Sequence, residues 1–171
     1  MAEMPLEIER KYLIRRPAET LLRSLPEADP TAITQTYLKA DDSGMVRRVR
    51  KRGSEEKGWQ FTYTRKQVIG FSKRIELEDE ISEAQYQALL DESEPTMHPI
   101  AKVRWTFRYE GQFFELDVYE LSDTLATLEI ELPDIDTPVK FPPMLELIKD
   151  VTGKRGYSNF AMSLNNGFPE T

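Results

Sequence analysis

The chain has 171 residues, of which 39% are hydrophobic and 31% charged, and its formal net charge is -7. This length suits one domain, residues 1–171, with a core of its own. The acidic balance argues against sequence-independent binding of nucleic acid or of acidic membranes, because both need a basic field. The segment 1–11 lacks the apolar stretch of a secretory signal, and no apolar run is long enough to span a membrane, so we expect a cytoplasmic protein.

The predicted elements give an α+β fold in which antiparallel strands dominate. Strands are expected at 6–14, 33–39, 44–52, 58–66, 71–80, 99–109, 112–120 and 124–132, with turns such as Asp41-Asp42-Ser43-Gly44 between them. Helices are expected at 17–25, 82–92 and 142–151. Ser82 and Gln85 form a capping box for the second helix, and the third begins at Pro142-Pro143 and ends at Gly153. The tail from Tyr157 is expected to be loosely ordered, with one further turn at most.

Four acid-x-acid pairs lie on the predicted strands, namely Glu7/Glu9, Glu76/Glu78, Glu115/Asp117 and Glu129/Glu131. The same spacing occurs with basic residues at Arg48/Arg50 and Lys102/Arg104. Strand side chains alternate between faces, so both charges of a pair point the same way while the residue between them, often apolar, points to the other face. A single pair of this kind is usually a solvated strand face. Four acidic and two basic pairs together favour a built site.

Eight strands are about the number at which a closed antiparallel barrel begins to hold a small ligand. The apolar strand faces, which carry Trp105 and Phe107, need cover, and the three predicted helices can supply it. The charged faces would then line a wet interior in which acids and cations balance one another. This arrangement predicts a tunnel with a charged lumen and with helices packed outside.

The residue types indicate the chemistry of such an interior. The chain has no cysteine, and its one histidine, His98, is expected at the surface of a proline-flanked loop. Carboxylates without these ligands select hard cations, Mg²⁺ or Mn²⁺. Arginine and lysine side chains bind phosphate oxygens, and metal and cations around a phosphate chain are typical of phosphoryl transfer. No Gly-x-x-x-x-Gly-Lys-Ser/Thr loop is present, which argues against a P-loop nucleotide site.

An ordered set of motifs resembles the CYTH superfamily, the triphosphate tunnel metalloenzymes. Glu7-Ile8-Glu9-Arg10-Lys11 resembles its Glu-x-Glu-x-Lys signature, and Arg48-Val49-Arg50 its Arg-x-Arg strand. Further matches, spread over nearly the whole chain, are Tyr63-Thr64-Arg65-Lys66, Arg74-Ile75-Glu76-Leu77-Glu78, Lys102-Val103-Arg104, Glu115-Leu116-Asp117, Glu129-Ile130-Glu131 and Val151-Thr152-Gly153 with Tyr157-Ser158-Asn159. Lys154 departs from the pattern, because relatives often carry an acid after this glycine.

The resemblance implies an eight-stranded antiparallel tunnel that acts on triphosphates with a divalent metal. It assigns metal binding to Glu7, Glu9, Asp117, Glu129 and Glu131, with Glu115 the weakest of the acids. It assigns the phosphate chain to Lys11, Arg48, Arg50, Lys66, Arg74, Lys102 and Arg104. Glu76 and Glu78 would hold a second metal or form salt bridges in the lumen. Glu7, Glu9 and Lys11 are the catalytic candidates, and the general base is either a carboxylate or Lys11.

Hydrolysis of inorganic triphosphate to pyrophosphate and phosphate is the leading functional hypothesis. The predicted charged faces carry few aromatic residues that could hold a base, so tripolyphosphate should be cleaved more efficiently than ATP. A nucleoside or thiamine triphosphatase and a class IV type adenylate cyclase are alternatives, and a non-catalytic polyphosphate-binding module is a further one. The small-molecule substrate is the expected partner, without nucleic acid or membrane, and a homodimer stays open.

Three features have a second interpretation. The basic run from Arg47 to Arg52 could form a nucleic-acid patch, although the net charge disfavours it. Trp59 could stack on a ring, but packing near a hairpin is favoured. Tyr157 and Asn159 either close the site or dock the tail, and the sequence does not separate these two roles.

Overall fold

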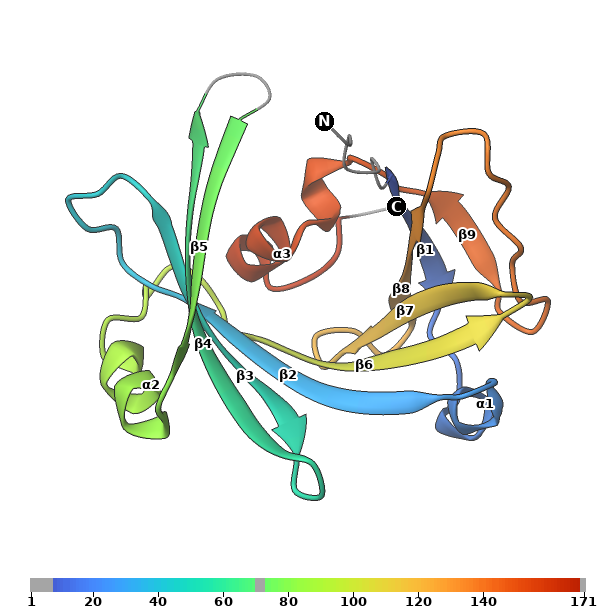
Figure 1. Ribbon diagram of the computed structural model, residues 1–171, viewed down its shortest axis with the longest axis horizontal. Helices are drawn as coiled ribbons and strands as arrows, with labels where there is room; N and C mark the ends of the chain where they lie inside the picture. The colour runs from blue at the N-terminus through green and yellow to red at the C-terminus, as the bar shows by residue number, and fades with distance from the viewer. Residues whose placement is uncertain (1–7, 70–72, 170–171) are drawn as a thin grey trace, which may run out of the picture. The chain divides into compact units, whose positions relative to one another are not determined.

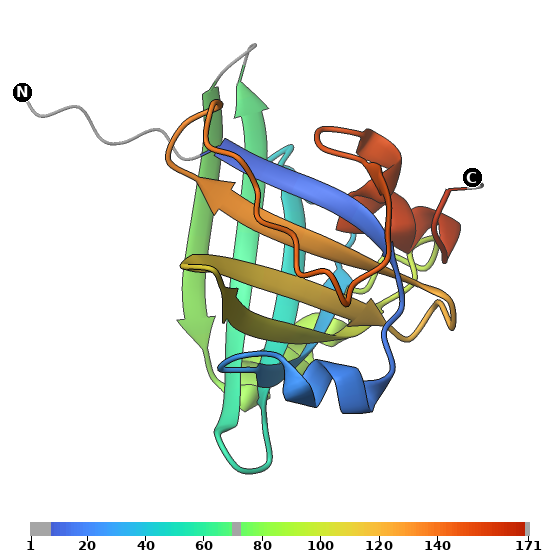
Figure 2. The same ribbon diagram turned by 90° about the vertical axis from the view of Figure 1, so that its right-hand side faces the viewer.

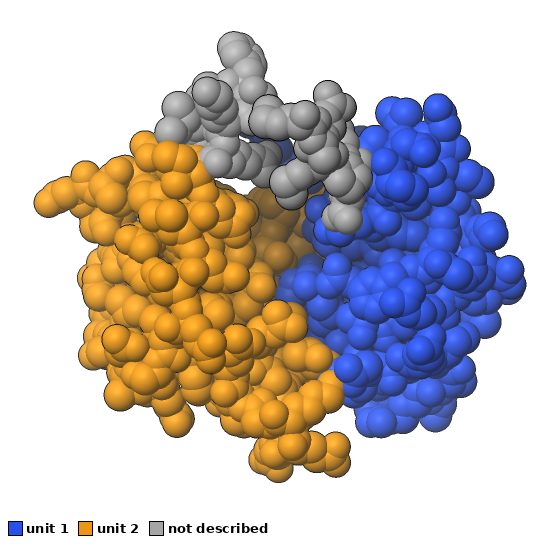
Figure 3. Space-filling view, in the orientation of Figure 1, with its two compact units in different colours: residues 1–30, 102–155 blue, residues 31–101, 156–171 orange. Residues whose placement is uncertain are grey.

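The computed structural model describes residues 8–69 and 73–169. These residues fall into two compact units, coloured separately in Figure 3. Among the described residues, unit 1 comprises 8–30 and 102–155, and unit 2 comprises 31–69, 73–101 and 156–169. The elements, in chain order, are β1 (Ile8–Arg15), α1 (Glu19–Ser24), β2 (Asp29–Tyr37), β3 (Val46–Ser54), β4 (Gly58–Ile69), β5 (Lys73–Ile81), α2 (Glu83–Leu90), β6 (Ile100–Tyr109), β7 (Gln112–Tyr119), β8 (Leu125–Leu132), β9 (Leu147–Asp150), the 3-10 turn η1 (Arg155–Tyr157) and α3 (Asn159–Asn165).

The strands of unit 1 form an antiparallel sheet in the order β6-β7-β8-β1-β9, which Figures 1 and 2 show from two sides. The β6–β7 hairpin turns at Glu110 and Gly111, which both have positive φ. Glycine adopts this backbone conformation readily, and the turn sets the register in which Arg104 faces Asp117.

One face of the unit 1 sheet is apolar and forms the larger core. The residues Tyr12, Trp105, Phe107, Phe114, Leu116 and Leu128 are buried there, with the rings of Phe107 and Phe114 stacked at 5.3 Å between centroids. Helix α1 covers this face with Leu22, and Leu25 follows directly behind it. Phe141 closes another part, with its ring edge-on to Tyr12 at 4.7 Å. The predicted packing of Trp105 beneath a helix is therefore confirmed.

Unit 2 contains a second antiparallel sheet in the order β5-β4-β3-β2. Its apolar face carries Val49 and Phe61, which pack with Tyr86 of α2. Helix α2 begins with the predicted capping box, because Ser82 accepts a hydrogen bond from the backbone of Gln85 and the Gln85 side chain accepts one from the backbone of Ser82. The helix therefore lies on the face opposite Arg48 and Arg50.

The segment after Tyr157, expected to be loosely ordered, forms the helix α3. The Ser158 side chain caps this helix by accepting a hydrogen bond from the backbone of Ala161 at 3.1 Å. Met162 is fully buried, and Ser163 exchanges two hydrogen bonds with the backbone of His98. Tyr157 is also buried. Among its two predicted roles, the structure supports docking of the tail.

The predicted helix at 142–151 is wrong. Residues 147–150 form the short strand β9, which pairs with β1 through Leu13 and Lys149 and through Tyr12 and Asp150. The spacing of the apolar residues Leu145 and Ile148 suited a helix. All four residues of the segment 147–150 are exposed, however, so a helix there would have no buried side, and the edge of β1 provides hydrogen-bond partners for the backbone. The described residues thus contain nine strands rather than eight. The antiparallel α+β class is confirmed.

Several predicted boundaries also move. Strand β2 begins at Asp29 and includes Pro30, which the sequence analysis placed before the strand. Strand β4 extends to Ile69, three residues beyond its predicted end, and β5 begins at Lys73. The predicted turn at Gly70 lies outside the described residues. No helix in the described part of the chain is long and apolar enough to cross a membrane.

Candidate functional site

The charged side chains of unit 1 lie together on the face opposite the apolar core. In the strand register, Glu9 on β1 faces Glu131 on β8, and Lys11 faces Glu129. Glu129 also faces Glu115 on β7. The alternation predicted from the acid-x-acid spacing is therefore present in the sheet.

Two of these cross-strand pairs, Glu9 with Glu131 and Glu115 with Glu129, bring like charges directly opposite each other. Such pairs destabilise a sheet unless a cation lies between them or the carboxylates are well hydrated. Burial, followed by the charge of Glu129, raises the pKa of Glu9, although Lys11 opposes the shift. Lys11 Nζ lies 3.4 Å from Glu129 Oε1. The cluster therefore favours an added positive charge.

Asp117 lies on the same face and is bound by two cations. Lys102 Nζ donates to Oδ2 at 2.8 Å, while Arg104 donates from Nε to Oδ1 at 2.9 Å and from Nη2 to Oδ2 at 3.0 Å. Burial alone would raise the pKa of Asp117, but Lys102 and Arg104 outweigh it and lower the pKa to about 2. Arg104 also contacts Glu115, with Nη1 2.9 Å from Oε2. In this structure Asp117 acts as the counter-ion of Lys102 and Arg104.

The donor set of this face fits a divalent cation in chemical type, because it consists of carboxylates without histidine or cysteine. Glu9, Glu129 and Glu131 are the candidates on neighbouring strands. No group of three or more acid, histidine or cysteine side chains in the described part of the chain is close enough to bind a metal ion. Glu7, another predicted ligand, lies outside the described residues. The metal roles of these residues and of Asp117 stay predictions.

The predicted phosphate-binding cations of unit 2 share one face of its sheet. Arg48 faces Thr64 across β3 and β4, and Val46 on the same strand faces Lys66. Arg50 lies two residues beyond Arg48 and therefore on the same face. The backbone of Arg74 pairs with Val68, but its side chain lies outside the described part. The structure thus places Arg48, Arg50 and Lys66 together.

Gln35, which the sequence analysis did not identify, holds Arg50. Its Oε1 accepts hydrogen bonds from Arg50 Nε at 3.2 Å and from Nη2 at 2.9 Å. Gln35 is fully buried, and its Nε2 has no hydrogen-bond partner among the described residues. Gln35 thus fixes the plane of the Arg50 guanidinium.

Glu76 and Glu78 lie on β5 opposite Lys66 and Thr64 respectively. Both acids are exposed. Thr64 donates a hydrogen bond from Oγ1 to Glu78 Oε1 at 3.1 Å. Both of their predicted roles, a second metal site and salt bridges in the lumen, stay predictions, and the hydrogen bond from Thr64 is the contact that the structure shows for Glu78.

The basic run from Arg47 to Arg52 divides between two faces of β3. Arg47 is buried on the face of α2, where it donates to Tyr63 Oη at 2.7 Å and to Glu92 Oε1 at 3.1 Å. Lys51 lies over the ring of Trp59, with Nζ 4.3 Å from its centroid. Arg48 and Arg50 point to the opposite face. This division argues against a continuous nucleic-acid patch.

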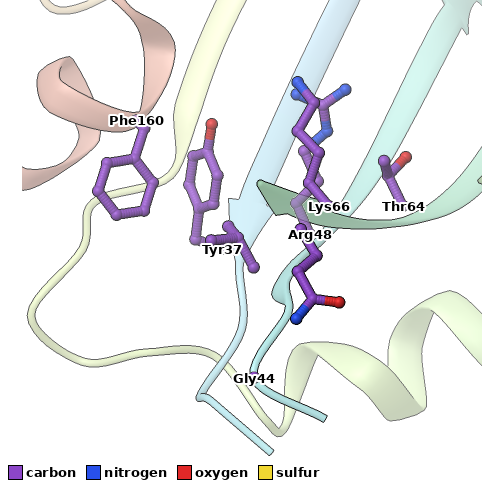
Figure 4. Close-up of a pocket in the computed structure, with 8 residues that line it drawn as sticks. Tyr37, Gly44, Arg48, Thr64, Lys66 and Phe160 are labelled. Carbon is purple, nitrogen blue, oxygen red and sulfur yellow. The ribbon is translucent and has the colours of Figure 1, made fainter. Parts of the chain in front are cut away.

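Two aromatic residues of unit 2 that the sequence did not indicate as site residues lie beside the cationic face (Figure 4). Tyr37 lies opposite Arg48 in the register of β2 and β3, so its ring shares the cationic face. Phe160 on α3 packs edge-on against Tyr37, with 5.3 Å between the ring centroids. The spacing of Tyr37 and Gln35 on a predicted strand could have indicated their common face. No signal in the sequence links Phe160 to Tyr37.

Comparison with known proteins identifies the family. The CYTH domain model matches residues 5–138, well over half of the chain. The chain belongs to the CYTH family. No curated protein matched the chain.

Two solved structures resemble the CYTH chain over nearly its full length. One is described as the hypothetical protein NE1496, with 27% identity, a TM-score of 0.66 and coverage of 96% of this chain and 100% of that one. The other is described as the inorganic triphosphatase NE1496, with 25% identity, a TM-score of 0.66 and coverage of 99% and 100%. The predicted family resemblance is therefore confirmed. Family and fold together support triphosphatase-like hydrolase chemistry, and the family generally uses divalent metals.

Proposed function

We propose that the protein hydrolyses inorganic triphosphate to pyrophosphate and phosphate with Mg²⁺ or Mn²⁺. The observation that carries this proposal is the register of the unit 1 sheet, which sets Glu9 opposite Glu131 and Glu115 opposite Glu129 on neighbouring strands. A protein that only binds polyphosphate gains nothing from acids kept together at a cost to stability. Acids in this arrangement suit a site that binds a cation during turnover.

The metal ligands in this proposal are Glu9, Glu129 and Glu131, with Glu7 as a further ligand from the family signature. A bound divalent ion would neutralise phosphate oxygens and favour the attack of water. Both oxygens of Asp117 accept hydrogen bonds from the cations Lys102 and Arg104. We propose that Asp117 orients Lys102 and Arg104 toward the substrate.

The cations of unit 2 bind the phosphate chain in this proposal. Arg48 and Arg50 each present a guanidinium, which binds phosphate oxygens through paired N–H groups, and Lys66 adds a compact charge. Gln35 keeps the guanidinium of Arg50 in one plane. A phosphate chain held by several fixed cations loses less entropy on the way to the transition state. This positioning lowers the activation barrier of hydrolysis.

Glu9 and Lys11 are the candidates for moving the proton of the attacking water. Burial raises the pKa of Glu9, but a cation bound to its carboxylate would lower that pKa again, so the shift does not assign the base to Glu9. Lys11 lies 3.4 Å from Glu129 and could stabilise the leaving phosphate instead. The base in this proposal is a carboxylate or Lys11, and Lys11 also binds the substrate.

A nucleoside or thiamine triphosphatase is the second candidate function. The aromatic pair of Tyr37 and Phe160 favours it, because the predicted shortage of aromatic side chains on the charged faces no longer holds for unit 2. A class IV type adenylate cyclase and a non-catalytic polyphosphate-binding module are weaker alternatives.

Phosphate release from tripolyphosphate, ATP and thiamine triphosphate tests the proposal. Each substrate is measured with Mg²⁺, with Mn²⁺ and with EDTA. We expect metal-dependent release with the highest kcat/KM for tripolyphosphate. A consistently higher kcat/KM for ATP, or formation of cyclic AMP, would replace the leading function with an alternative.

A further inference from the structure

The backbone of Lys11 is held by a threonine from the other end of the chain. Lys11 donates from its backbone N–H to Thr152 Oγ1 at 2.9 Å, and the Thr152 hydroxyl donates to the carbonyl oxygen of Lys11 at 3.3 Å. The same carbonyl accepts a second hydrogen bond, from the backbone of Val151, at 2.9 Å. Both peptide groups that flank the Cα of Lys11 therefore have partners in the loop after β9.

Thr152 takes the place of a strand residue that β9 does not supply. The pairing of β9 with β1 ends at Asp150, which faces Tyr12, and Lys11 is the residue of β1 just before Tyr12 (Figure 1). Gly153 has a φ of +71°, a conformation that glycine adopts readily, so the chain can turn away directly after Thr152. A hydroxyl can accept one hydrogen bond and donate another, so one side chain serves both backbone groups of Lys11.

The loop that carries Thr152 is itself anchored. Val151 is fully buried, and its carbonyl accepts a hydrogen bond from the backbone of Lys154 at 3.0 Å. The backbone N–H of Thr152 donates to Asp150 Oδ1 at 2.8 Å, and Asp150 Oδ2 lies 3.8 Å from Arg10 Nη1. Thr152 is exposed, so its methyl group adds little to the core. Its contribution to the structure lies in the hydroxyl.

The position of the Lys11 side chain depends on this backbone. Lys11 lies on the charged face of unit 1, where its Nζ is 3.4 Å from Glu129 Oε1 and only 12% of its side chain is exposed. Peptide groups that are fixed on both sides of a Cα atom set the direction of the Cα–Cβ bond. An ammonium group that is held in place beforehand meets a phosphate chain at a smaller cost in entropy.

We propose that Thr152 is a positioning residue for Lys11, which keeps the ammonium of Lys11 directed at the phosphate chain during hydrolysis. This inference rests on the proposed function, because it assigns a role in the same reaction. Thr152 acts through Lys11 rather than by contact with the substrate. The inference also gives a task to the Val151-Thr152-Gly153 motif, for which the residue types indicated no chemical role.

Thr152→Val tests the proposal, because it removes the hydroxyl and keeps the shape of the side chain. Thr152→Ser keeps the hydroxyl. Thr137→Val is the matched control, since Thr137 is a loop threonine of unit 1 whose hydroxyl donates to Asp134 Oδ1 at 2.9 Å. With tripolyphosphate and Mg²⁺, Thr152→Val should lower kcat/KM by about tenfold, less than the roughly hundredfold cost of a misplacement of about 1 Å. The serine and control variants should stay within about twofold of wild type.

Hydrogen exchange of the Lys11 amide, followed by NMR, checks the contact without reference to hydrolysis. Thr152→Val should speed this exchange by about tenfold, the scale of losing one hydrogen bond, while Thr152→Ser and Thr137→Val leave it near the wild-type rate. Wild-type exchange and turnover in Thr152→Val, or a serine variant as slow in turnover as the valine variant, would overturn the proposal.

A separate NMR measurement distinguishes failure of this inference from failure of the proposed function. Tripolyphosphate with Mg²⁺ should shift the side-chain resonances of Lys11 in wild type and shift them less in Thr152→Val. If wild type releases no phosphate but the shift is still reduced in Thr152→Val, the hydrolytic function fails while the positioning role stands. An equal shift in both proteins would show that the Lys11 ammonium does not depend on Thr152.

Discussion

Lys102 and Asp117 form an ion pair that is almost completely buried, with Nζ 2.8 Å from Oδ2. Arg104 binds the same carboxylate through two further hydrogen bonds. Charged groups removed from water in this way need partners on every side, so this trio fixes the positions of two cations on β6.

Asp117→Asn should lower the free energy of unfolding by about 3 kcal/mol, because it leaves the buried ammonium of Lys102 with a neutral partner. Chemical denaturation in EDTA measures the change without interference from bound metal. Glu120→Gln, an exposed change just after the same strand, serves as the control and should cost less than about 0.5 kcal/mol. Equal stability of the two variants would show that the buried pair does not support the fold.

The stability of the wild type should depend on Asp117 in a defined pH window. Its pKa of about 2 in the folded state lies below the ordinary 3.8, so the folded state favours the carboxylate. The resulting stabilisation of about 2 kcal/mol is complete above about pH 4 and is lost as the pH falls toward 2. The difference in unfolding free energy between wild type and Asp117→Asn should shrink over that range. A constant difference from pH 5 to pH 2 would contradict the lowered pKa.

Glu129→Gln should reduce hydrolysis by at least about a hundredfold, the scale of losing a key electrostatic contact in an active site. Its effect on stability should be small, because it removes the repulsion with Glu115 while Lys11 loses one ion pair. Steady-state phosphate release and thermal unfolding of the same preparation separate the two effects. A variant that is folded and fully active would place the metal elsewhere.

Gln35→Glu should raise the KM for tripolyphosphate by about tenfold and change kcat less. The new carboxylate would have nearly the same shape as the amide but would offset the charge of Arg50, which then attracts phosphate oxygens less. Gln35→Met removes the two hydrogen bonds without adding charge and should give a smaller rise. The ratio of the two KM values is the measurement that matters. If methionine weakens binding as much as glutamate does, the loss of the two hydrogen bonds to Arg50, and not the added charge, weakens binding; an unchanged KM in both variants would contradict the role of Gln35.

The sequence was informative where side-chain alternation is strict. Glu129 and Glu131 surround Ile130, and Lys102 and Arg104 surround Val103, so the charged and apolar faces of unit 1 follow from a period of two. The same reasoning placed Arg48 and Arg50 together on β3. These predictions depend only on strand geometry, which long-range packing does not alter.

The failures concern contacts between segments far apart in the chain. Residues 147–150 pair with β1 because β1 has a free edge for a further strand. No local pattern in the sequence indicates this pairing. Phe160 reaches Tyr37 across more than a hundred residues of sequence, and this contact depends on how α3 docks. Gln35 carries no charge and belongs to no recognised motif, although it lies within hydrogen-bond distance of Arg50.

Metal-dependent cleavage of tripolyphosphate is the most direct test of the proposed function. Phosphate release by the wild-type protein should proceed with Mg²⁺ or Mn²⁺, stop on addition of EDTA and resume when excess metal is restored. The acids of unit 1 would repel the substrate without a cation, so the metal requirement follows from Glu9, Glu129 and Glu131 themselves. Undiminished turnover in EDTA, or no release from tripolyphosphate with either metal, would contradict the account.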